Sequence, residues 1–181
     1  MRIWRALKEA LAGWIALVRG EADWRRHFSI SAAGLATALV LFVFFALLSI
    51  ALATADVGIP NFFGLIIALV VQSLSIVALL IGIHVTRRMV PGEARVMDLL
   101  VPGVYALIAY LVVGTFLSLI AGPVLILLWI GLAILLFYLG WRAGGWNIGV
   151  SAAFAVLTMV LLVGMPVTLY MVLGPVAAPT Q

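Results

Sequence analysis

The sequence predicts an all-α fold: a polytopic transmembrane helical bundle of about five spans, preceded by an amino-terminal interfacial amphipathic helix. The first observation is composition, since 67% of the 181 residues are hydrophobic and only 9% are charged, against roughly 45–50% and about 25% in a soluble domain. A small globule cannot hide so many apolar side chains, because surface takes up a large share of its area. The second observation is arrangement, since long uncharged runs alternate with short basic segments, as in membrane-spanning chains.

Residues 1–28 are predicted to form a cytoplasmic interfacial segment. Between Arg2 and Arg19, apolar side chains recur at helical spacing on one face, at Ile3, Leu7, Leu11, Trp14 and Val18. This pattern indicates an amphipathic helix, and a polar face rich in Lys and Arg suits the headgroup layer of anionic lipid. The residues expected to contact lipid or a partner are Arg2, Trp4, Arg5, Lys8 and Trp14. In the plainer alternative, the helix only orients the first span.

The first two spans are predicted at residues 29–53 and 62–85, joined by a connection that contains Asp56 and Pro60. The segment Ala53-Thr54-Ala55 has the small-residue form of a signal cleavage site. The apolar run before it has roughly 25 residues, whereas the apolar region of a signal peptide has about 7–15. We therefore interpret this run as an uncleaved first span.

Spans three to five are predicted at residues 102–121, 124–141 and 148–173, followed by a short non-cytoplasmic tail at 174–181. The segment from Leu99 to Trp141 has no charged side chain, and it is long enough for two spans of roughly 20 residues each. Because proline fits the first turn of a helix, Pro102 and Gly122-Pro123 place the starts of spans three and four. Pro166 should kink the fifth span.

Five spans satisfy the positive-inside rule. The amino-terminal segment, the loop after span two and the loop after span four hold all ten Lys and Arg. This distribution predicts a cytoplasmic amino terminus and a carboxyl terminus outside. The loop at 87–98 has two interpretations: Arg87 and Arg88 contact lipid or a partner, or they serve only as inside determinants of the neighbouring spans.

The sequence contains few residues that are suited to catalysis or metal binding. No Asp, Glu, Lys or Arg falls within a predicted span, so a proton relay or an ion-coupled carboxylate site has no groups to use. There is no Cys, and the two His and six acidic residues show no metal-ligand spacing. We therefore predict no enzyme, catalytic residue, metal or cofactor. No nucleic-acid partner is predicted either, because the basic residues lie in short segments beside apolar runs, where membrane topology requires them. The remaining enzymatic alternative is lipid chemistry with His84 and Asp98 as an acid–base pair.

A few uncharged polar residues lie within the predicted spans, namely Gln72, Ser73, Ser75, Thr115 and Ser118. In one interpretation they line a path for a neutral or apolar solute, which would make the protein a small transporter or channel. In the other they form hydrogen bonds between packed helices, as such residues commonly do in membranes. The second interpretation is preferred.

Three short motifs lie between residues 62 and 173: Pro91-Gly92-Glu93-Ala94-Arg95, the Gly122-Pro123 turn, and Phe137-Tyr138-Leu139-Gly140-Trp141. With these motifs, the chain resembles the Yip1 family of five-span membrane proteins. The Asp-Leu-Tyr-Gly-Pro segment of eukaryotic members is not found, so no functional residue is carried over. The resemblance implies a membrane-embedded scaffold or trafficking factor, which in eukaryotes engages small GTPases at the Golgi. The compact loops are more similar to a bacterial inner-membrane member.

These observations lead to one functional hypothesis and one alternative. The hypothesis is a non-enzymatic integral membrane protein, a Yip1-like scaffold or trafficking factor that binds membrane lipids, anionic lipids among them, or other membrane proteins, including further copies of itself. The alternative is a small transporter or channel for a neutral or apolar solute.

Overall fold

The computed structural model describes residues 2–54, 58, 61–90, 94–118 and 125–173. Every regular element in these ranges is a helix, as the sequence predicted. The elements are α1 (Arg2–Arg19), α2 (Trp24–His27), α3 (Ala32–Ala53), α4 (Phe62–Met89), α5 (Val96–Ser118), α6 (Leu125–Tyr138), the π-helical turn η2 (Leu139–Ala143) and α7 (Ile148–Leu173). Five of them are long and apolar enough to cross a membrane: α3, α4, α5, α6 together with η2, and α7.

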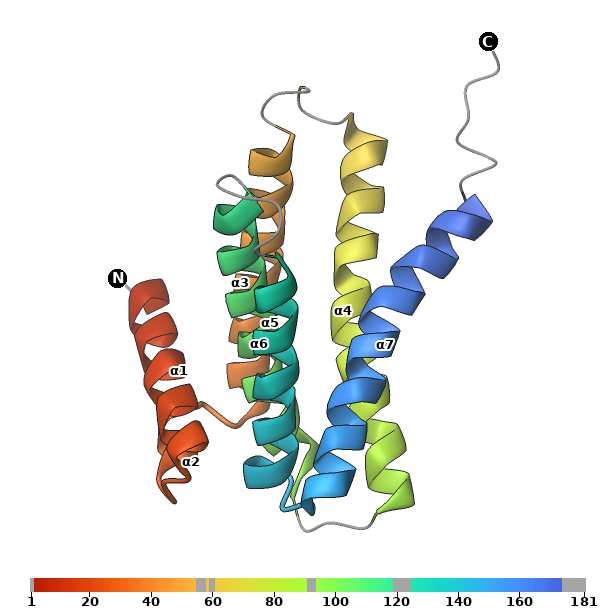
Figure 1. Cartoon of the computed structure of the whole chain (residues 1–181). Coiled ribbons are helices and arrows are strands. Elements are labelled where there is room, and N and C mark those ends of the chain that lie inside the picture. Colours follow the sequence, from red (N-terminus) through yellow and green to blue (C-terminus); the bar gives the residue numbers. More distant parts are fainter. Residues whose placement is uncertain (1, 55–57, 59–60, 91–93, 119–124, 174–181) are drawn as a thin grey trace.

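The five long helices run side by side, and α5 is the central one (Figure 1). In α5, 67% of the most apolar stretch is buried inside the bundle, against 22–28% in the other four. Helices α3, α4 and α6 pack against α5, while α7 packs against α4 and α6. Helices α1 and α2 stand outside the bundle, where α1 packs on α2, η2, α5 and α6.

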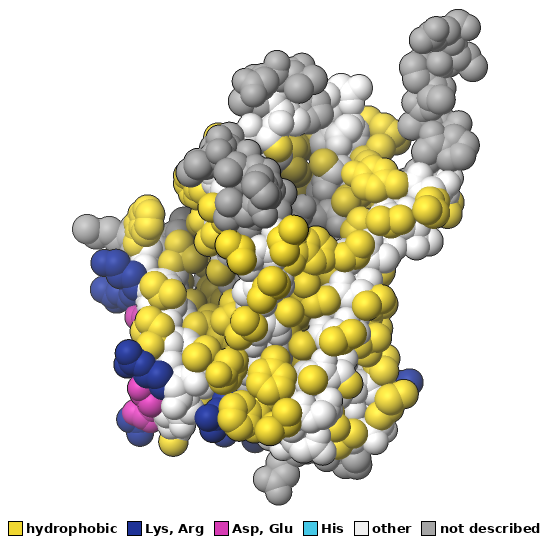
Figure 2. All heavy atoms as spheres, viewed as in Figure 1, with side chains coloured by type: hydrophobic (Ala, Val, Ile, Leu, Met, Phe, Trp, Pro, Cys, Tyr) yellow, Lys and Arg dark blue, Asp and Glu magenta, His cyan; other side chains and the backbone are white. Residues whose placement is uncertain are grey.

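The outer surface of the bundle is apolar. Figure 2 shows hydrophobic side chains over most of the visible face, whereas Lys and Arg gather over α1 and α2 and at the lower end of the molecule. Large apolar side chains are exposed on every long helix, for example at Phe44, Phe63, Phe116, Ile130 and Val160. An exposed apolar surface of this extent is stable in lipid and not in water. The protein is therefore an integral membrane protein.

Polar side chains cap the starts of three spans. The capping residues are Ser31 for α3, Asn61 for α4 and Asn147 for α7, and each accepts a hydrogen bond from the backbone N–H three residues later. Helix starts leave such N–H groups without an intrahelical partner, and Ser and Asn are among the best caps. The first span therefore begins at Ala32, three residues after the predicted start at 29.

The predicted start of the third span at Pro102 is wrong, because α5 begins at Val96 and Pro102 lies inside it. The Asp98 carboxylate accepts a hydrogen bond from the Arg95 N–H at 3.3 Å, as an acidic residue at the third helical position does in a capping box. This local cap starts the helix two turns before the proline. Proline leaves only the Asp98 carbonyl without its helical partner, and that carbonyl lies in the first turn of α5.

The other span boundaries differ less from the prediction. Helix α4 runs to Met89 instead of 85, so Arg87 and Arg88 occupy its last turn, where positive charge is favourable. The fourth span continues past Tyr138 through η2 to Ala143, and α7 coincides with the predicted fifth span. The carboxyl-terminal part of α7 leans away from α4 (Figure 1). The Gly122-Pro123 turn, Ala55 and the tail at 174–181 lie outside the described residues.

Candidate functional site

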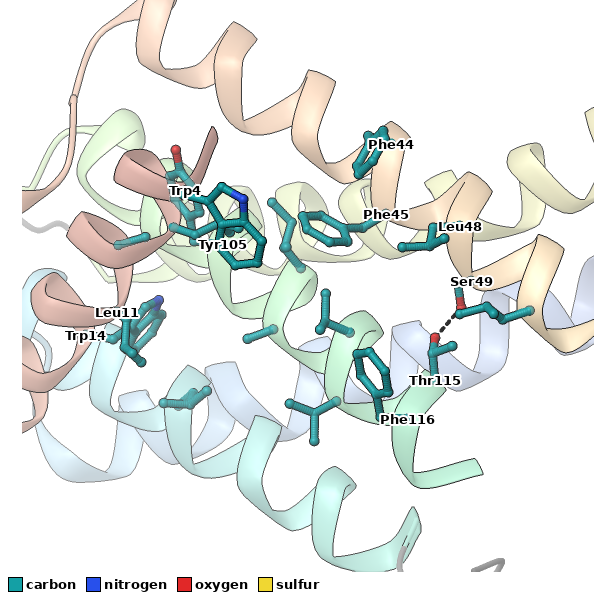
Figure 3. Close-up of a pocket in the computed structure, with 18 residues that line it drawn as sticks. Trp4, Leu11, Trp14, Phe44, Phe45, Leu48, Ser49, Tyr105, Thr115 and Phe116 are labelled. Atoms are coloured by element: carbon teal, nitrogen blue, oxygen red, sulfur yellow. Dashed lines mark hydrogen bonds between the residues drawn. The ribbon is translucent and has the colours of Figure 1, made fainter. Parts of the chain in front are cut away.

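An apolar groove of about 770 Å³ lies between α1 on one side and α3 and α5 on the other (Figure 3). Its walls are aromatic and aliphatic side chains from these helices, with a contribution from Leu135 of α6. The labelled lining residues in Figure 3 are Trp4, Leu11, Trp14, Phe44, Phe45, Leu48, Ser49, Tyr105, Thr115 and Phe116.

An aromatic cluster anchors one end of α1 to the bundle. Phe28 is buried at its centre, with ring centroids 6.5 Å from Trp14, 6.2 Å from Trp24 and 6.0 Å from Tyr105. Gly13 lets the α1 backbone approach this cluster, since a Cβ there would lie 2.6 Å from Phe28 Cε2. We call Trp14, Trp24, Phe28 and Tyr105 the aromatic cluster. It holds the carboxyl-terminal half of α1 against α2 and α5.

The part of α1 from Trp4 to Trp14 forms the outer wall of the groove. Trp4 is 73% exposed and Leu11 is 64% exposed, although both line the groove. The sequence placed Leu11 and Val18 on the same apolar face as Trp14, but only Trp14 of these three is buried. The apolar face of α1 is therefore only partly buried against the rest of the protein.

Few polar atoms reach the groove. The Ser49 hydroxyl of α3 and the Thr115 hydroxyl of α5 share a hydrogen bond, and Thr115 also donates to the Leu111 carbonyl at 2.8 Å. Because each hydroxyl is engaged, this pair adds little polarity to the groove wall. The buried Trp14 Nε1–H has no acceptor among the described residues.

A second, basic pocket of about 570 Å³ lies at the end of the bundle where α2, the start of α5 and the segment after η2 meet. Its lining side chains include Arg25, Arg95, Asp98 and Arg142. Asp98 has only 12% of its side chain exposed, and its carboxylate lies 3.5 Å from Arg25 Nη2. A buried carboxylate needs such partners, because burying an unpaired charge is costly.

Arg142 is held in place by contacts on its flat faces. Its Cζ lies 4.0 Å from the centroid of the Trp141 ring, within the range of a cation–π contact. It also lies close to Gly20, since a Cβ there would be 2.9 Å from Arg142 Cζ. Gly20 has a φ of +75° and ends α1 with the paired hydrogen bonds of a Schellman motif, Gly20 N–H to Leu17 O and Glu21 N–H to Ala16 O.

The residues predicted to contact lipid or a partner fall into three groups. Trp4 and Trp14 line the groove together with Thr115, a member of the predicted polar cluster. Arg5 and Lys8 are exposed on α1 and do not line it. Arg87 and Arg88 end α4 and do not line the basic pocket. The Arg2 and Ser118 side chains lie outside the described residues.

The polar residues of α4 do not line the groove with Thr115. The Ser73 and Ser75 hydroxyls each donate at 2.7 Å to a carbonyl of α4 itself, those of Val70 and Gln72. Gln72 is half-buried. For the acid–base alternative, His84 is exposed on α4 and is not among the residues that line the basic pocket with Asp98.

Sequence reasoning missed the basic pocket because the positive-inside rule already explained its arginines. Asp98 offered one signal, since it is an acidic residue three positions after Arg95 and directly before an apolar run. Arg142 offered another, as the single charged residue between spans four and five, next to Trp141. Comparison of the chain with family models, with curated proteins and with solved structures finds no match, so the resemblance to the Yip1 family stays a prediction from sequence.

Proposed function

We propose that this integral membrane protein acts by binding membrane lipid, with acyl chains in the groove between α1 and helices α3 and α5. The observation that carries the proposal is an apolar groove beside the long apolar helices α3 and α5, whose outer wall leaves Trp4 and Leu11 largely exposed. Apolar surfaces without neighbouring atoms lose their dispersion contacts. Lipid chains supply those contacts in a bilayer.

Size and chemistry support the same occupant. The groove volume of about 770 Å³ falls within the roughly 300–1,000 Å³ of ligand sites. The unpaired Trp14 Nε1–H beside it is a hydrogen-bond donor that suits an ester carbonyl of a lipid after a small shift of the ring. Indole groups commonly occupy this apolar-to-polar boundary of membranes.

The wider role that follows is a non-enzymatic lipid-binding scaffold or trafficking factor of the Yip1-like kind. The exposed Arg5 and Lys8 of α1 suit anionic lipid or an acidic partner, either another membrane protein or a second copy of this chain. In the same proposal the amino terminus is cytoplasmic, the carboxyl terminus is outside and the membrane is a bacterial inner membrane. The transporter alternative has less support, because the Ser73 and Ser75 hydroxyls are bonded within their own helix.

The test fills the groove without disturbing the core. Ala109 lines the groove and is exposed, so Ala109→Trp adds bulk there. Ala152 of α7 is also exposed but does not line the groove, and Ala152→Trp is the matched control. Native mass spectrometry of the protein purified in mild detergent should find phospholipid on the wild type and on Ala152→Trp and much less on Ala109→Trp. Equal lipid on all three proteins would refute the proposal.

A further inference from the structure

We propose that the basic pocket binds a phosphate group, either on a lipid headgroup or on a soluble molecule. Three arginines and one aspartate line the pocket, which leaves two positive charges in excess. Asp98 pairs with Arg25, whereas Arg95 and Arg142 form no ion pair among the described residues. A phosphate ester carries about one to two negative charges, which matches this excess.

Two of the three arginines, Arg25 and Arg142, are held by contacts with the protein itself. Arg142 is stacked on Trp141 and lies against Gly20, while Arg25 is held by Asp98 at 3.5 Å and lies 5.2 Å from the Trp24 ring centroid. Binding then loses less side-chain entropy. The planar guanidinium also presents paired N–H donors that match phosphate oxygens, which an ammonium group does not.

The position of the pocket also suits a phosphate. It lies where α5 begins and where the fourth span ends, which is the level of the headgroups around a bundle whose spans are apolar. Basic pockets between membrane helices at such a level bind anionic headgroups. The start of α5 adds the positive end of a helix dipole. This assignment is independent of the groove, because the two sites have no lining residue in common.

The experiment distinguishes binding of a phosphate group in this pocket from nonspecific attraction of anionic lipid to positive charge on the protein surface. The full-length protein is purified in mild detergent, incubated with equal parts of phosphatidylcholine and phosphatidylglycerol, and measured by native mass spectrometry. The wild type should retain phosphatidylglycerol in preference. Arg142→Gln should lose about tenfold of that preference, as expected for one charge-assisted hydrogen bond, and Arg142→Lys should restore only part of it. Arg26→Gln removes an equal charge from an exposed position of α2 that does not line the pocket, and should retain the wild-type preference.

A second arm identifies the source of the phosphate. Inorganic phosphate is titrated against the labelled protein by thermophoresis. Saturable binding that Arg142→Gln weakens shows that a soluble phosphate suffices, whereas no binding together with a phosphatidylglycerol preference indicates a lipid headgroup. Either result supports the proposal. Arg95→Gln serves in place of Arg142→Gln if the latter does not elute as a folded protein.

Two results would overturn this proposal. One is an equal loss of preference in Arg142→Gln and Arg26→Gln, which would indicate diffuse surface charge. The other is a wild-type protein with neither a headgroup preference nor phosphate binding. Because total bound lipid reports on the groove and headgroup preference reports on the basic pocket, the two proposals fail separately.

Discussion

The contact between α4 and α7 provides the sharpest test of the packing. Gly82 of α4 faces Thr158 of α7, and a Cβ at Gly82 would overlap Thr158 Oγ1 and lie 3.4 Å from Phe154 Cε2. Thr158 is fully buried, and its hydroxyl oxygen has no hydrogen-bond partner among the described residues. Small residues at such positions let membrane helices approach closely. Gly82→Ala should therefore force the two helices apart.

The magnitude follows from two opposing terms. Overfilling a packed site costs about 1–3 kcal/mol, whereas replacing glycine with alanine in a helix contributes about 1 kcal/mol of stability. Gly82→Ala should therefore lower the free energy of unfolding by about 1 kcal/mol. In the Thr158→Ala background the overlapping oxygen is gone, so the same substitution should be neutral or stabilising. The coupling between the two substitutions should be about 1–3 kcal/mol.

The assay is reversible unfolding in mixed detergent micelles, followed by circular dichroism, for the wild type, both single variants and the double variant. Gly131→Ala is the matched control, because a Cβ at Gly131 of α6 meets no atom within 4 Å. Gly131→Ala should gain the helix stability that comes from replacing glycine with alanine, and no steric clash should oppose it. Equal shifts for Gly82→Ala and Gly131→Ala, or additive effects of Gly82→Ala and Thr158→Ala, would refute the packing argument.

Three further predictions concern α1 and the groove. Gly13→Ala places a Cβ 2.6 Å from the aromatic cluster and should loosen α1, which limited trypsin cleavage after Arg19 would report; unchanged cleavage would contradict this. Gly20→Ala puts a side chain at a φ of +75°, which costs about 1–2 kcal/mol, and it should also displace Arg142. We expect a lower melting temperature together with a weaker phosphatidylglycerol preference. A lower melting temperature with an unchanged preference would argue against the contact between Gly20 and Arg142. Ser49→Ala removes the hydrogen bond to Thr115 and should cost about 0.6 kcal/mol in the unfolding assay; a loss above 2 kcal/mol would indicate a larger network.

The number of candidate spans and the approximate bounds of most of them follow from the sequence, because charge and hydropathy determine which segments can enter a membrane. Helix α1 begins at Arg2 and ends at Arg19, and α7 begins at Ile148 and ends at Leu173, as predicted. The start of α5 was missed because a proline rule was applied where a local cap decides. The Asp98 side chain accepts from the Arg95 N–H, and this starts the helix before the proline is reached.

The candidate sites were less accessible to sequence reasoning, because they form between segments far apart in the chain. Trp4 and Trp14 were selected for their interfacial preference, but nothing in the sequence places them opposite Phe45 of α3 across a groove. The basic pocket joins Arg25 to Asp98, 73 positions later. Charge patterns predict the side of the membrane on which each residue lies. They do not predict which residues it contacts in the folded protein.

The position of Gly20 at the end of α1 has a thermodynamic consequence for both sites. Trp14 of α1 lines the groove, and Gly20, six positions later, lies against Arg142 of the basic pocket. A ligand in one site that stabilises the docked position of α1 therefore also stabilises the form of the protein in which the other site is complete. By linkage the effect is reciprocal. If an occupied basic pocket raises the affinity of the groove for an acyl chain by some factor, an occupied groove raises the affinity of the pocket for its anion by the same factor.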